Sequence, residues 1–68
     1  MSVALGYYRH YKGGRYRVLT TATHASTGET LVIYWGANST WAREISSFTS
    51  MVTVGDKEVP RFAAEENP

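Results

Sequence analysis

The chain has 68 residues, no cysteine and a formal net charge of +1. A chain of this length makes one domain that buries only about 60% of its unfolded surface. The lack of cysteine excludes disulfide bridges and thiolate zinc sites. Small domains without such cross-links gain stability from tight packing or from oligomerisation, so we expect a homo-oligomer. The near-neutral charge argues against a strong phosphate-binding surface over the whole molecule.

The amino-terminal stretch MSVALGYY has no basic region followed by a long apolar run, so no signal peptide is predicted. Residues 1–6 are expected to be a flexible lead-in or a short edge strand. No stretch approaches the ~20 apolar residues that a membrane span requires. We therefore expect a cytoplasmic protein that does not bind membranes.

Short strands separated by turns are predicted after residues 7–11, which alternate poorly between polar and apolar side chains. The run from Thr30 to Trp35 is the most apolar, which indicates a central strand with both faces covered. Pro60 places the last strand at a sheet edge, because proline cannot donate a hydrogen bond to a central ladder. The predicted strands are residues 16–22, 30–35, 40–43, 52–54 and 58–62.

One helical or 3-10 turn interrupts this pattern, because the sequence ISSFTSM over residues 45–51 places apolar side chains three residues apart. Short strands with frequent turns are typical of small barrels and sandwiches. We expect a single all-β domain over residues 7–62, specifically an SH3-like barrel of about five strands. Residues 63–68 are predicted to be a frayed polar tail in which Glu65 and Glu66 are solvated.

The order of short motifs along the chain resembles a bacterial family known only as a domain of unknown function (family 1653). Members of that family open with a Tyr-x-His-Tyr-Lys-Gly signature, which stands here as Tyr8-Arg9-His10-Tyr11-Lys12-Gly13. The resemblance covers nearly the whole chain and supports the β fold, but it implies no activity. The further matches, in order, are Tyr16-Arg17-Val18, the hairpin His24-Ala25-Ser26-Thr27-Gly28-Glu29, Leu31-Val32-Ile33-Tyr34, Trp41-x-Arg43, Phe48 and Val59-Pro60-Arg61-Phe62.

Two features depart from the family pattern. Glu44 stands where the family usually has proline, and the segment from Trp35 to Thr40 is shorter than the usual loop before the tryptophan. If that loop forms a pocket wall, this chain is expected to bind a different ligand or none.

The two histidines are candidates for chemistry. A zinc site would need a third ligand such as Glu29 or Glu58 beside His10 and His24, and the spacing matches no metal motif, so no metal or cofactor is predicted. General-base catalysis would need a nucleophile or a bound water beside one imidazole. We favour the simpler interpretation that each imidazole tethers a loop by bonding a backbone carbonyl.

Aromatic and basic side chains cluster near the amino terminus. Aromatic rings stack on bases and cations meet phosphates, so this cluster is a candidate nucleic-acid or nucleotide surface. Tyrosines also fill the cores of small β domains, and the near-neutral charge favours this structural role. The cluster consists of Tyr7, Tyr8, Tyr11 and Tyr16 with Arg9, Lys12, Arg15 and Arg17.

A second aromatic and basic group follows. Trp41 and Arg43 would suit a nucleotide or an anionic peptide as an aromatic wall with a cationic hook. Alternatively, Trp41 plugs the core and Arg43 pairs with a carboxylate such as Glu58. Trp35 ends an apolar run, and its exposure would indicate an interface. Arg61 is expected to point outward and to join Arg43 in a basic rim.

The aromatic and basic side chains favour a non-enzymatic binding module for a nucleic acid or nucleotide. One version of this hypothesis is an oligomer that sequesters a nucleotide signal. The alternative is a protein-interaction module that uses an exposed aromatic patch. A small hydrolase using His10 or His24 ranks third, because no nucleophile and base are recognisable and no catalytic residue is assigned. The predicted ligand-binding residues are Tyr8, His10, Tyr11, Lys12, Arg17, Trp41 and Arg43.

Overall fold

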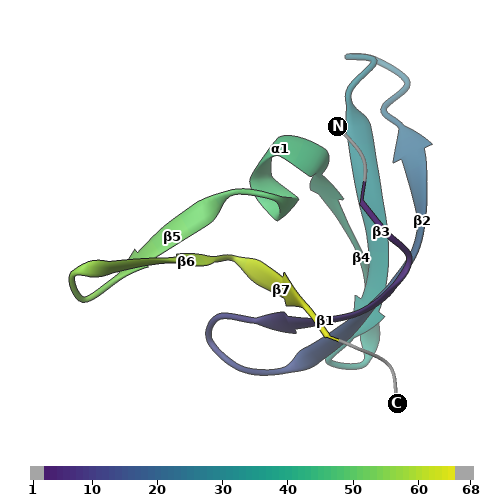
Figure 1. Ribbon diagram of the computed structural model, residues 1–68. Helices are drawn as coiled ribbons and strands as arrows, with labels where there is room; N and C mark the ends of the chain where they lie inside the picture. Colours follow the sequence, from purple (N-terminus) through teal and green to yellow (C-terminus); the bar gives the residue numbers. More distant parts are fainter. Residues whose placement is uncertain (1–2, 66–68) are drawn as a thin grey trace.

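A computed structural model describes residues 3–65, which form two antiparallel sheets and one short helix. The five-stranded sheet has the order β4-β3-β2-β1-β7, and β5 and β6 form a two-stranded sheet that projects beside it (Figure 1). Within the described residues, no helix is long and apolar enough to cross a membrane. The strands are β1 (Gly6–His10), β2 (Arg15–Thr23), β3 (Thr30–Gly36), β4 (Ser39–Glu44), β5 (Met51–Val54), β6 (Lys57–Pro60) and β7 (Phe62–Ala64), and α1 spans Ile45–Phe48.

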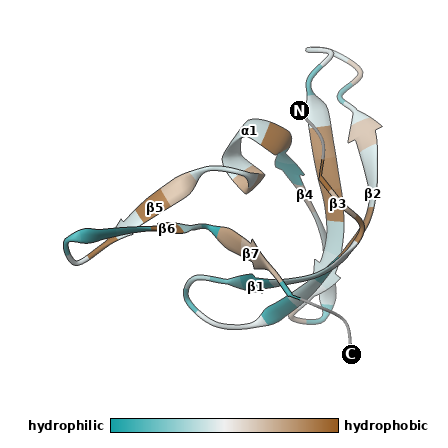
Figure 2. Ribbon diagram, in the orientation of Figure 1, coloured by the Kyte–Doolittle hydropathy of each residue, from teal (hydrophilic) through white to brown (hydrophobic). Residues whose placement is uncertain are grey.

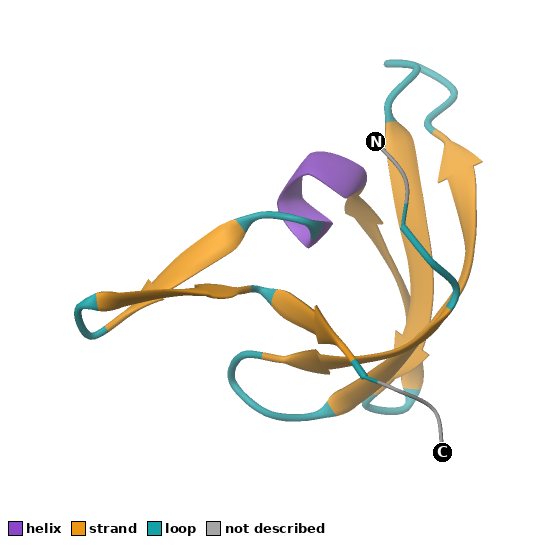
Figure 3. Ribbon diagram, viewed as in Figure 1, coloured by secondary structure: helices purple, strands orange, loops and turns teal. Residues whose placement is uncertain are grey.

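The all-β class is confirmed, and strands dominate the fold in Figure 3. The expected closed SH3-like barrel is not found among residues 3–65, because β4 and β7 end the five-stranded ladder without meeting, and β5 pairs with β6. The predicted strand over residues 58–62 is divided at Arg61. The amide of Arg61 donates to the carbonyl of Ser50, and its carbonyl accepts from the amide of Tyr11, both at 3.0 Å. These bonds turn the chain from β6 into β7.

Strand β1 lies in a segment for which the sequence indicated no strand. Tyr7 and Tyr8 are neighbours with the same amphipathic side chain, so the segment shows no alternation even though its residues face opposite sides. β1 is held on both edges: Tyr8 pairs with Tyr16 of β2 and with Ala64 of β7. The pairing of β1 with β2 and β7, rather than its local sequence pattern, therefore makes this segment a strand. Of the expected lead-in over residues 1–6, residues 1 and 2 lie outside the described part of the chain.

The core lies on one face of the five-stranded sheet, called here the inner face, and consists largely of aromatic rings. Helix α1 brings Phe48 over this face, where it stacks on Phe62 with ring centroids 4.2 Å apart. The edges of Tyr8 and Tyr34 meet Phe48 at 5.3 and 5.5 Å. Figure 2 shows that β3 and α1 both include strongly hydrophobic stretches. The buried residues are Tyr8, Val18, Val32, Tyr34, Phe48 and Phe62.

The opposite, outer face of the sheet is largely exposed, which corrects the prediction that both faces of the third strand are covered. On β3, Val32 and Tyr34 are buried, whereas Trp35 is 47% exposed. On β2, Tyr16 points to the inner face and its neighbours Arg15 and Arg17 are exposed. The amino-terminal aromatic and basic cluster is therefore divided between the two faces.

The carboxyl-terminal segment is better ordered than the predicted solvated tail. The Glu65 carboxylate accepts hydrogen bonds from Nε of Arg9 at 3.1 Å and from Nε of Arg15 at 3.0 Å. Its amide donates to the carbonyl of Tyr7 at 2.9 Å. These contacts fix the end of β7 beside β1, and Glu66 lies outside the described residues.

Candidate functional site

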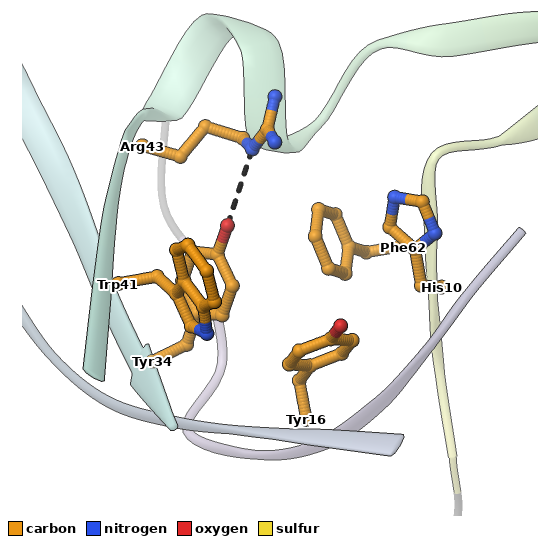
Figure 4. A pocket seen from close by; sticks show the side chains of 6 residues that line it. All are labelled: His10, Tyr16, Tyr34, Trp41, Arg43 and Phe62. Carbon is orange, nitrogen blue, oxygen red and sulfur yellow. Dashed lines mark hydrogen bonds between the residues drawn. The ribbon is translucent and has the colours of Figure 1, made fainter. Parts of the chain in front are cut away.

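A cavity of about 150 Å³ opens on the inner face. Every strand of the five-stranded sheet contributes to it, so the cavity depends on the whole sheet. Figure 4 shows the lining side chains converging on one space, with the Arg43 guanidinium on one side and the Tyr16 ring on another. The lining residues are His10 of β1, Tyr16 of β2, Tyr34 of β3, Trp41 and Arg43 of β4, and Phe62 of β7.

The rings around the cavity hold one another in edge-to-face contacts. The Tyr34 ring lies 5.7 Å from Tyr16 and 5.3 Å from Phe62, and the His10 imidazole lies 4.9 Å from Phe62. Aromatic rings prefer this arrangement, because the positive edge of one meets the negative face of another. The walls are therefore braced by aromatic contacts.

Gly36 connects two walls of the cavity. Its carbonyl accepts a hydrogen bond from Nε1 of Trp41 at 2.9 Å. A Cβ at Gly36 would lie 2.2 Å from Cδ1 of Tyr16, so only glycine lets that ring rest on the strand. Trp41 is 44% exposed and forms a wall of the cavity, which corrects the view that it plugs the core.

Arg43 is fixed by two side-chain hydrogen bonds. Its Nε donates to the Tyr34 hydroxyl at 3.2 Å, shown dashed in Figure 4, and its Nη1 donates to Oγ of Ser47 at 3.1 Å. The expected pairing with Glu58 is wrong, because Glu58 lies opposite Thr53 in the β5–β6 hairpin. Among residues 3–65, Nη2 of Arg43 makes no hydrogen bond, so its two donors remain for a ligand.

Both histidines tether loops, as predicted, but each accepts from a backbone amide where a bond to a carbonyl was expected. Nδ1 of His10 accepts from the amide of Lys12 at 3.2 Å, and Nδ1 of His24 accepts from those of Ser26 and Thr27 at 3.1 and 3.3 Å. When His10 is neutral, its proton therefore lies on Nε2. No group of three or more potential metal ligands is found within residues 3–65.

The electrostatic surroundings of the cavity are positive. Burial of the His10 imidazole lowers its pKa, and the charges of Arg43, Arg61 and Lys12 lower it further. None of the six lining residues is a carboxylate. Arg61 thus joins Arg43 near His10, in line with the expected basic rim, although its Nε is held by Oγ of Ser50 at 3.1 Å. The cavity is suited to an anionic or carbonyl-bearing ligand.

The lowered pKa of His10 makes stability depend on pH. The unfolded chain binds a proton more readily at this residue, so the free energy of unfolding rises with pH between the folded and the unfolded pKa. We expect stability to fall as the pH drops through the ordinary histidine pKa of about 6.5. The measurement is the urea midpoint between about pH 7.5 and 5.5. His10→Gln should flatten this dependence. Equal pH profiles of stability for His10→Gln and the unaltered chain would contradict the prediction.

The seven predicted ligand-binding residues are not on one surface. His10, Trp41 and Arg43 line the cavity. Tyr11 and Lys12 follow His10 in the turn after β1, where the Tyr11 ring lies 4.7 Å from the imidazole. Tyr8 is buried in the core, and Arg17 is exposed on the outer face.

Sequence reasoning did not assign Tyr34, Phe62 or Gly36 to a site, and it placed Tyr16 in the amino-terminal aromatic and basic cluster but not among the predicted ligand-binding residues. Tyr34 and Phe62 read as ordinary core residues, because they lie in strands and are indeed buried. The one signal in the sequence was that Tyr16 and Tyr34 stand in two strands that follow each other, β2 and β3. The lining side chains converge because of the strand order of the sheet. That order places β7, near the end of the sequence, beside β1, near its beginning.

The fold and the cavity define the chain as an all-β domain with an open aromatic pocket. Residues 6–64 match the family described as "Protein of unknown function (DUF1653)", and the chain belongs to this family. It is similar to the crystal structure of a DUF1653 protein from Bordetella bronchiseptica, at 30% sequence identity and a TM-score of 0.85. That match covers 98% of this chain and 95% of the other. No curated protein matches the chain in sequence.

Proposed function

We propose that the chain is a non-enzymatic binding module for a pyrimidine nucleotide, with the base in the inner-face cavity. The observation that carries the proposal is the composition of the cavity wall, which combines aromatic rings with cationic and neutral donors and has no carboxylate. Its volume of about 150 Å³ suits one six-membered ring, since an apolar cavity of about this size holds benzene. A purine would extend beyond the walls.

Hydrogen-bond donors support a base rich in carbonyl groups. His10 and Arg43 both line the cavity, and Nε2–H of neutral His10 and Nη2 of Arg43 are the donors that these side chains do not use within residues 3–65. Uracil and thymine present two carbonyl acceptors, whereas cytosine replaces one with an amino donor. We therefore expect uridine and thymidine nucleotides to bind more tightly than cytidine nucleotides.

The positive charges near His10 support a phosphate on the same ligand. Arg43, Arg61 and Lys12 all lie close enough to lower the pKa of His10. Phosphate is a preferred partner of guanidinium groups, with which it forms paired charge-assisted hydrogen bonds. A nucleoside lacking phosphate is expected to lose this part of the binding energy.

Calorimetric titration of the chain with UMP, CMP, AMP and uridine tests the proposal. We expect saturable binding of UMP that is stronger than binding of CMP, AMP and uridine, and weaker at higher salt because the phosphate contacts are screened. Arg17→Gln removes one charge from the outer face and serves as the matched control, which should bind UMP unchanged. The absence of saturable binding by any of the four ligands would refute the proposal.

The two alternative functions, a small hydrolase and a protein-interaction module, have less support from the geometry. In the described part of the chain, neither imidazole forms a hydrogen bond with a serine or threonine hydroxyl, as a histidine-activated hydrolase would require. A protein-interaction module is favoured by exposed apolar side chains, Met51 and Val54 on the projecting β5–β6 hairpin and Trp35 on the outer face. That exposure names no partner, whereas the cavity has a defined size, lining and charge.

A further inference from the structure

The outer face of the five-stranded sheet carries a second concentration of aromatic and basic side chains. Tyr7, Arg17 and Trp35 lie in register across β1, β2 and β3. Arg9 and Arg15 form the neighbouring cross-strand pair. We call these five residues the outer arginine face. They lie on the side of the sheet opposite the cavity, because each of them adjoins Tyr8, Tyr16 or Tyr34 in its strand, and these tyrosines point to the inner face.

The arginines of this face are held against aromatic rings. The Arg15 guanidinium lies 4.0 Å from the centroid of the Tyr7 ring, and that of Arg17 lies 5.9 Å from it. Cation–π contacts of this kind hold a guanidinium flat on a ring and leave its edge free to donate. These three side chains, Trp35 and the turn over residues 36–38 together line a hollow of about 470 Å³.

The charge of the face is strongly positive. Three arginines share it, and Glu65 is the one carboxylate that contacts any of them within residues 3–65. Glu65 occupies Nε of Arg9 and Nε of Arg15 and leaves Arg17 without an acidic partner in that region. Trp35 is 47% exposed beside Arg17, with which it pairs across strands.

We propose that the outer arginine face binds single-stranded nucleic acid. Exposed rings on a sheet offer stacking surfaces for unpaired bases, and arginines between them meet the phosphates. Here Trp35 supplies the exposed ring, and Arg17 lies in register between it and Tyr7, whose half-buried ring holds the Arg15 guanidinium. A duplex keeps its bases stacked on one another and would reach only the arginines. The proposal uses other residues than the nucleotide cavity and is independent of it.

The test is fluorescence anisotropy with a labelled ten-nucleotide oligodeoxyadenylate, whose purine bases are too large for the cavity, and the full chain, between 50 and 200 mM salt. We expect Trp35→Ala to weaken binding about tenfold or more through lost stacking. Arg17→Gln should reduce the slope of log affinity against log salt by about 0.7, as expected for one lost phosphate contact on a single strand. A duplex of the same length should bind more weakly.

Two controls separate this face from general electrostatic attraction and from the cavity. Lys57→Gln removes an equal charge from the β5–β6 hairpin and should leave binding unchanged. An excess of UMP, which occupies the cavity, should leave binding of the oligonucleotide to the outer face unchanged. Equal weakening by Arg17→Gln and Lys57→Gln, or no binding at 50 mM salt, would overturn the proposal. So would self-association of the chain that Trp35→Ala abolishes, because the face would then join two copies.

Discussion

Gly36→Ala is expected to destabilise the domain by about 1–3 kcal/mol and to abolish binding in the cavity, because the new methyl group overpacks the inner face. The added Cβ would lie 2.2 Å from Cδ1 and 2.7 Å from Cε1 of Tyr16, so the ring must move. Displacing Tyr16 removes one wall of the cavity and its edge contact with Tyr34. Thermal unfolding should show a fall in Tm on the order of 10 °C, since a domain of this size loses roughly 4–8 °C per kcal/mol.

A double-mutant cycle shows whether the Tyr16 ring is the cause. Tyr16→Ala removes the atoms that the new methyl group would meet, so Gly36→Ala should have little effect in that background. Gly36 does not have a left-handed backbone, so alanine fits its conformation and only the side-chain contact matters. An equal loss of stability in both backgrounds would contradict this explanation.

Arg43→Gln is expected to weaken UMP binding by about 10- to 100-fold, the range for losing a charged hydrogen-bond donor worth about 1.5–3 kcal/mol. Arg43 is held by Tyr34 and Ser47 before any ligand arrives, so it needs little reordering on binding. Dissociation constants from calorimetry measure the effect, and circular dichroism confirms that the variant is folded.

The conservative variant Arg43→Lys distinguishes charge from geometry. Lysine keeps the positive charge but lacks the planar fork that contacts both the Tyr34 hydroxyl and Ser47. We expect an intermediate affinity for UMP with its salt dependence retained. UMP binding by Arg43→Gln within twofold of that of the unaltered chain would show that Arg43 does not contact the ligand.

Local pattern was sufficient for four strands that are rich in β-forming residues or bounded by turn signals. β2, β3, β4 and β5 were each predicted within one residue at either end, and the helical turn begins at Ile45 as predicted although it ends at Phe48. β1 was missed, because Tyr7 and Tyr8 hide the alternation. The open arrangement of the sheets was also beyond local pattern, since it depends on the pairing of β7 with β1 and on the separate β5–β6 hairpin.

The candidate site was predicted only in part for a related reason. Some site residues can be recognised from their side-chain chemistry alone, namely His10, Trp41 and Arg43. Tyr16 and Phe62 become part of the site only through contacts with residues distant in sequence. Gly36 matters because of its contact with the ring of Tyr16, 20 positions earlier in the chain. The amino-terminal cluster was read as one surface, whereas the two-residue period of strands sends Tyr16 and Arg17 to opposite faces.

The two tryptophans allow one measurement to test the central claim, that the inner-face cavity is the nucleotide site. Trp41 lines the cavity, and Trp35 is exposed on the outer face. In a ¹⁵N-labelled chain titrated with UMP, the two indole N–H signals report on the two faces separately, and Trp35→Phe assigns them. We predict that the Trp41 signal shifts saturably while the Trp35 signal stays in place. A shift of the Trp35 signal alone, or no shift of either at millimolar UMP, would contradict the claim.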